Sequence, residues 1–170
     1  MSENPIVQSH IGGLETTKGL FHIMLKGEFS EENLTYQIAP SKSHILWLVG
    51  HIANSYDEGF NPPLGLKSEF PNNYKELFKM GAKPVNDASA YPTLKELIDA
   101  FDTATNATLE HLKTVTDEEL KRPFPEDSEV AKFAANADIL LHEATFHTAY
   151  HLGQVSMLRR AQNLETGTGM

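Results

Sequence analysis

Four long segments of the chain place apolar residues at helical spacing, and no stretch alternates apolar and polar residues as a strand would. The expected helices span residues 5–26, 42–56, 94–115 and 136–161. A chain of 170 residues suits one hydrophobic core. The pattern therefore predicts an all-α four-helix bundle, in a single domain over residues 1–164, with a disordered tail at residues 165–170.

Local signals mark where two of these helices begin. Ser41 follows Pro40 directly and is the expected N-cap of the second helix. The third helix opens with Thr93-Leu-Lys-Glu96, a capping box in which each side chain can bond the backbone N–H of the other residue.

The link between the second and third helices is long and rich in proline. It holds about 30 residues, more than an ordinary connection between neighbouring antiparallel helices needs. We expect a crossover that leaves the two helices parallel, with a short helix near residues 71–80.

Composition excludes several classes of protein. The sequence contains no cysteine, so a disulfide, a cysteine nucleophile and thiolate metal ligands are excluded, and any metal must be bound through nitrogen and oxygen. A net charge of -9 argues against binding to nucleic acid. No apolar run approaches the roughly 18 residues of a membrane span, and the N-terminus lacks the features of a secretory signal. We therefore expect a cytoplasmic protein that binds neither nucleic acid nor membranes.

Histidines are the candidate metal ligands in this chain, which has eight of them. His147 and His151 are four residues apart on the fourth expected helix, so both imidazoles can converge on one ion. Among eight histidines this spacing also arises by chance. His142-Glu143 does not begin a metalloprotease HExxH motif because the next histidine follows at five residues. Glu143 and His147 are one residue too far apart for a di-iron Glu-x-x-His pair.

A third ligand has to come from another helix. His44 and His51 both fall in the second expected helix, on one face and two turns apart, about 10.5 Å, so one ion is not expected to use both. The alternative for either residue is a buried histidine whose ring nitrogens are hydrogen-bonded to a carbonyl or to a neighbouring helix.

Three motifs follow one another along the chain. They are Trp47-Leu-Val-Gly-His51-Ile, His147-Thr-Ala-Tyr-His151-Leu-Gly-Gln154 and Leu158-Arg159-Arg160. Their order and spacing resemble the DinB-like superfamily of metal-binding four-helix-bundle proteins, in which a long crossover joins helices two and three. The resemblance implies a site in which His51, His147 and His151 bind zinc or nickel together with water, and in which Gln154 supports the ligands.

The resemblance also bears on function. Some members of that superfamily are transferases or isomerases that use a low-molecular-weight thiol such as bacillithiol or mycothiol, and the absence of cysteine means that any thiol has to come from a cosubstrate. We expect the protein to bind a divalent metal ion and to act as a thiol S-transferase on a small molecule whose identity the sequence does not give. We also expect it to form a homodimer. Two alternatives stay open: a non-catalytic metal-binding stress-response protein, and a metal-free helical interaction protein.

Overall fold

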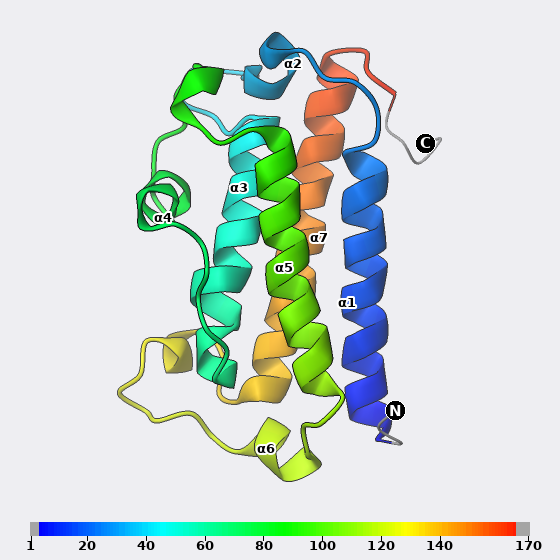
Figure 1. Ribbon diagram of the computed structural model, residues 1–170, viewed down its shortest axis with the longest axis vertical. Coiled ribbons are helices and arrows are strands. Elements are labelled where there is room, and N and C mark those ends of the chain that lie inside the picture. Colours follow the sequence, from blue (N-terminus) through cyan, green and yellow to red (C-terminus); the bar gives the residue numbers. More distant parts are fainter. Residues whose placement is uncertain (1–3, 166–170) are drawn as a thin grey trace.

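Four long helices form the frame of the protein, whose computed structural model describes residues 4–165 (Figure 1). They are α1 (Pro5–Met24), α3 (Ile45–Asn54), α5 (Leu94–Leu112) and α7 (Ala137–Ala161). The shorter helical elements are α2 (Glu31–Thr35), the π-helical η1 (Ser55–Phe60), η2 (Pro62–Leu64), α4 (Asn72–Phe78), η3 (Ala88–Ala90), α6 (Asp117–Lys121) and η4 (Val130–Lys132). Within residues 4–165 the structure contains no β-strand. The predicted all-α four-helix bundle is confirmed.

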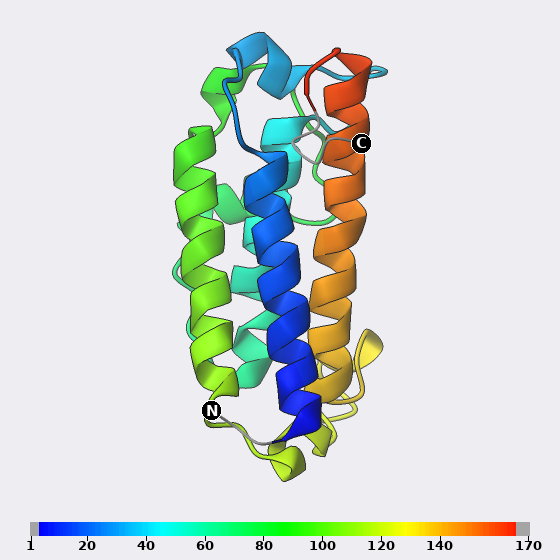
Figure 2. The same ribbon diagram turned by 90° about the vertical axis from the view of Figure 1, so that its right-hand side faces the viewer.

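The long helices pack in a ring in which α1 contacts α5 and α7, and α3 also contacts α5 and α7. Figure 1 shows α1 and α7 running in one direction and α3 and α5 in the other, and Figure 2 shows α1 between α5 and α7. The neighbours α3 and α5 are thus parallel, as the length of the crossover predicted.

The helix starts at Thr93 and Asn136 follow from local sequence. Thr93 Oγ1 accepts a hydrogen bond from the Glu96 N–H at 3.3 Å, and the Glu96 carboxylate accepts one from the Thr93 N–H at 2.8 Å, which confirms the capping box. Asn136 Oδ1 accepts a hydrogen bond from the Ile139 N–H at 3.0 Å at the start of α7. Each cap contributes on the order of 1 kcal/mol.

The predicted start of the second helix is wrong. Ser41 adopts a left-handed conformation with φ 63° in a turn closed by a hydrogen bond from the Lys42 N–H to the Ala39 carbonyl. The helix begins later, and His44 is its N-cap, with Nδ1 accepting a hydrogen bond from the Trp47 N–H at 3.1 Å. His44 therefore does not lie inside the helix on the face of His51.

All ten residues of α3 are buried, because the crossover covers the side of α3 that faces away from the ring. Both α2 and α4 pack against α3. In the segment 71–80, where a short helix was expected, α4 spans Asn72–Phe78. A helix that is apolar on every side requires such a cover.

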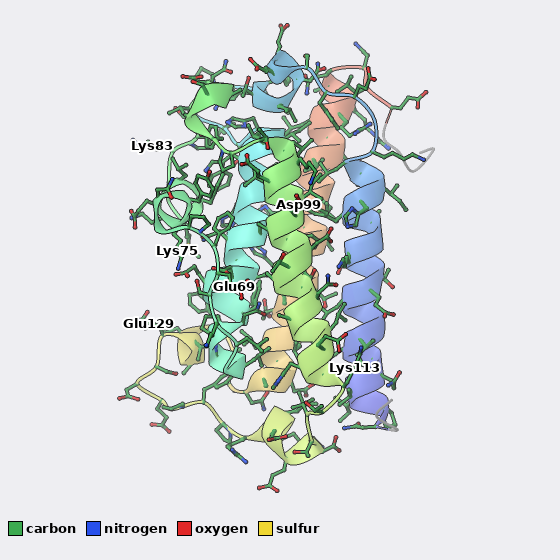
Figure 3. All side chains as sticks on the ribbon, in the orientation of Figure 1. Glu69, Lys75, Lys83, Asp99, Lys113 and Glu129 are labelled. Atoms are coloured by element: carbon green, nitrogen blue, oxygen red, sulfur yellow. The ribbon has the colours of Figure 1, made fainter. Side chains whose placement is uncertain are left out.

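Polar contacts attach the crossover to η1. The Asp57 carboxylate accepts hydrogen bonds from the backbone N–H groups of Glu69 and Phe70, at 2.7 and 3.0 Å. Lys75, labelled in Figure 3, reaches from α4 to η1, where its Nζ lies 2.5 Å from Glu58 Oε1. These contacts hold α4 against the bundle.

Two further expectations concern membrane-spanning segments and the C-terminal tail. None of the described helices is both long enough and apolar enough to span a membrane. Beyond Glu165, the expected disordered tail lies outside the described residues.

Candidate metal centre

Three histidine rings from two helices meet between α3 and α7. His147 Nε2 lies 3.3 Å from His51 Nε2 and 3.1 Å from His151 Nε2. His147 and His151 are one turn apart on α7, and His51 reaches them from α3. The structure thus brings together the three residues that the sequence motifs singled out.

These separations match those between the ligands of one small ion. Nitrogen ligands bound to zinc at about 2.0–2.1 Å in tetrahedral geometry are about 3.3–3.4 Å apart. The observed distances of 3.3 and 3.1 Å lie close to this value. One ligand atom from each of the three histidines also lies within 4.8 Å of the others, so the three rings are placed to share one ion.

The hydrogen bonds of two of the rings fix which nitrogen carries the proton. His51 Nδ1 lies 2.7 Å from the Phe78 carbonyl oxygen, and His151 Nδ1 lies 2.7 Å from Gln154 Oε1. Because these oxygens only accept, both Nδ1 atoms are protonated and both Nε2 atoms present a lone pair. The two lone pairs point at His147 Nε2, which can offer one proton to one of them. A neutral triad leaves at least one lone pair unsatisfied, whereas a cation among the three satisfies all of them.

His147 is held differently from its two neighbours. Its Nδ1 is buried and makes no hydrogen bond to any described residue. The ring of Phe60, from η1, lies against it edge-on with the centroids 5.7 Å apart. On its Nδ1 side this ring is therefore held by packing, and its polar contacts are confined to Nε2.

Burial keeps the triad uncharged. It lowers the pKa of His51 and His151 below the ordinary value of 6.5. Burial, with repulsion from His151 and His51, lowers the pKa of His147 to about 3. Near neutral pH the three rings therefore stay unprotonated at the nitrogens that would carry a positive charge. Neutral imidazole is the form that binds metal ions.

The C-terminal end of α4 positions the ligand on α3. Trp47 Nε1–H donates a hydrogen bond to the Leu77 carbonyl at 2.9 Å, and Phe78, the next residue, provides the carbonyl that accepts from His51. The indole of Trp47 also stacks on the His51 ring, with centroids 4.8 Å apart and planes 10° apart. Such partners orient a ligand and raise its basicity.

Gly50 makes this arrangement possible. A Cβ at position 50 would lie 2.2 Å from Cε1 of Phe78, whose side chain is fully buried. Only glycine lets the Phe78 ring lie directly on the backbone of α3, so that its carbonyl reaches His51. Sequence reasoning missed this role, although a glycine directly before a histidine in an apolar helix was a signal for it.

The other candidate residues have different places. Gln154 contacts His151, as the support role requires. His142 and Glu143 are exposed and outside the triad. His44 lies outside it as well, since its Nε2–H donates a hydrogen bond to the Val85 carbonyl at 3.0 Å while its Nδ1 caps α3.

Comparison with known proteins assigns the family. The sequence model of the DinB superfamily matches residues 20–155, which is most of the chain. The chain belongs to the DinB superfamily. Its fold is similar to the crystal structure of a DinB-like protein from Bacillus cereus, with a TM-score of 0.62 and 21% sequence identity, over 95% of this chain and 93% of that one. No curated protein matches the sequence.

Gly50→Ala in this DinB-superfamily protein should displace Phe78 and weaken the support of His51. We expect a loss of about 1–3 kcal/mol in the free energy of unfolding from overpacking, and about 10–100-fold lower zinc affinity. Urea denaturation and competition titration with a chromophoric chelator measure the two effects. Gly19→Ala is the matched control, because a Cβ there meets nothing within 4 Å, and it should stabilise α1 by about 0.5–1 kcal/mol. Equal zinc affinity in both variants would contradict the role of Gly50.

Stability of the metal-free protein should fall on acidification. The triad histidines titrate near pH 6.5 when unfolded and at lower pH when folded. Below pH 6.5 the unfolded chain therefore binds more protons, and the free energy of unfolding decreases as the pH falls toward the folded pKa values. Urea denaturation in the presence of a chelator, between about pH 7.5 and 4.5, measures this slope. His147→Gln should make the slope shallower, and an unchanged slope would show that His147 is not the group responsible.

Proposed function

We propose that this DinB-superfamily protein binds one divalent transition metal ion, zinc or nickel, through His51, His147 and His151. The observation that carries the proposal is the pair of Nε2 lone pairs, from His51 and His151, that converge on the third ring. Three neutral ligands leave the ion its full charge and an open coordination position, which is the pattern of catalytic rather than structural zinc sites.

We further propose that the protein is a metal-dependent S-transferase that uses a low-molecular-weight thiol. A divalent ion with an open position favours the thiolate form of a bound thiol, which is the nucleophilic form. The chain itself has no cysteine, so the sulfur has to come from a soluble cosubstrate. A cytoplasmic location fits this role, because small thiols are kept reduced there.

A groove that borders Gln154, the hydrogen-bond partner of His151, supports a small-molecule substrate. Its volume is about 470 Å³, and its lining includes Tyr150 and Gln154. Ile38 and Lys42, from the link before α3, also line it. The volume is in the range of small-molecule sites. The lining offers apolar contacts and one ammonium group, which suits a compact substrate with an apolar part and an anionic part.

The two alternatives each have a supporting feature. An ion bound by α3 and α7 would also brace the two helices, which supports a non-catalytic metal-binding protein. A row of exposed apolar side chains on α7 supports an interaction protein, and equally the expected homodimer. These side chains are Ile139, Phe146, Tyr150 and Met157. The homodimer stays a prediction.

Tag-free protein should bind about one zinc or nickel ion tightly. Reconstitution, removal of loosely bound metal and elemental analysis measure the content. His51→Ala, His147→Ala and His151→Ala should each lower the affinity by more than the 10–100-fold typical when only a partner of a ligand is lost. His111→Ala should leave it unchanged. A content well below half an equivalent in the wild type, or equal losses in all four variants, would overturn the proposal.

The transferase proposal predicts direct contact between thiol and metal. Cobalt-substituted protein should develop a sulfur-to-cobalt charge-transfer band when 2-mercaptoethanol, glutathione or bacillithiol is added. His151→Ala protein should show none. Conversion of a model electrophile by the zinc form, compared with the metal-free form, then tests catalysis. A spectrum that no thiol changes would overturn the transferase proposal and leave the metal site standing.

A further inference from the structure

A second group of metal-ligating side chains lies on the other side of α7, between α7 and α1. It consists of His10 on α1 with Asp138 and His142 on α7, and one ligand atom from each lies within 4.8 Å of the others. His142 precedes His147 by five residues, which turns it about 140° around the helix axis. The triad therefore faces α3, while this second group faces α1.

His10 is the fixed member of the second group. Its side chain is only 3% exposed, and its Nε2 lies 2.6 Å from Asp138 Oδ1. The His142 ring stands edge-on to the His10 ring, with centroids 4.7 Å apart. Asp138 and His142 are four residues apart, so they project from the same face of α7, one turn from each other.

We propose that His10, Asp138 and His142 form a second binding site for a divalent transition metal, of lower affinity than the triad. Two imidazoles and one carboxylate are a ligand set that zinc and its neighbours accept, with the remaining positions filled by water. A tetrahedral ion requires ligand atoms about 3.3–3.4 Å apart, which is more than the 2.6 Å between Asp138 Oδ1 and His10 Nε2. The half-buried Asp138 therefore has to move outward, and the exposed His142 has to adjust its position, around the buried His10. Lower affinity follows because this movement has to accompany binding, whereas His147 Nε2 in the triad already lies 3.3 and 3.1 Å from the Nε2 atoms of His51 and His151.

A similar pair elsewhere in the bundle lacks what makes this site. His22 Nε2 lies 2.9 Å from Asp102 Oδ1, again joining α1 to a neighbouring helix. The Lys18 ammonium lies 3.2 Å from the same carboxylate and would repel a cation. The pair of His22 and Asp102 thus has a nearby lysine and, among the described residues, no second histidine, whereas the candidate site has His142. His22 is therefore the matched control for His142.

The test is independent of the three-histidine site. Equilibrium dialysis of tag-free protein against zinc, followed by elemental analysis, should give two equivalents in the wild type. It should give one in the double variant His147→Ala/His151→Ala. Adding His142→Ala or Asp138→Asn should lower the affinity for the remaining equivalent at least 10-fold, while adding His22→Ala should leave it unchanged. His142 is exposed, so its replacement should not impair folding.

A second measurement tests whether the ion joins the two helices. Zinc should raise the thermal midpoint of the double variant, because an ion bound only by folded α1 and α7 stabilises the folded state. The same zinc concentration should not raise the midpoint once His142→Ala is added. Either of two results overturns the proposal: a wild type that binds only one equivalent, or a second equivalent that persists in both the His142→Ala and Asp138→Asn variants.

Discussion

Complete burial of α3 is the constraint on which the rest of the structure depends. Two of its sides pack on α5 and α7, and its remaining surface would face water unless α2 and the crossover with α4 covered it. Burial also removes water from the polar atoms that α3 carries, so each needs a protein partner. The Leu77 and Phe78 carbonyls at the end of α4 provide these partners for Trp47 and His51. The end of α4 therefore both covers the hydrophobic helix α3 and supports the candidate ligand His51.

The same burial gives the triad its chemical character. In a dry environment a charged imidazole is costly, so the three rings remain neutral and direct lone pairs at one point. That arrangement is poor as a purely structural hydrogen-bond network, because one proton cannot satisfy two acceptors. It suits a divalent cation. Another side of α7 carries the mixed cluster with His10, where the Asp138 carboxylate gives the buried His10 ring an ordinary hydrogen-bond partner.

Membership of the DinB superfamily fixes the architecture and leaves the reaction to the chemistry of the site. The similarity to the Bacillus cereus protein, at 21% identity, concerns the fold. The candidate site depends on three features of this chain: a glycine that admits Phe78, a glutamine that contacts His151, and a groove that this glutamine helps to line. A chain without cysteine that presents three neutral ligands has to take both the metal and any reactive sulfur from outside.

Sequence alone determined the features that depend on neighbours within about one helical turn. The capping box at Thr93, the start of α7 and the shared face of His147 and His151 follow from local spacing, because side chains four residues apart in a helix must lie together. Spacing could not decide between His44 and His51, and only the family resemblance favoured His51. The tertiary structure placed His44 at the N-terminal end of α3, because the left-handed turn at Ser41 delays the start of this helix. The carbonyl of Val85, from the crossover, then accepts the hydrogen bond from His44 Nε2–H. Contacts such as His51 with Phe78 and His10 with Asp138 join residues 27 and 128 positions apart. Such contacts depend on how the helices pack, which no local pattern encodes.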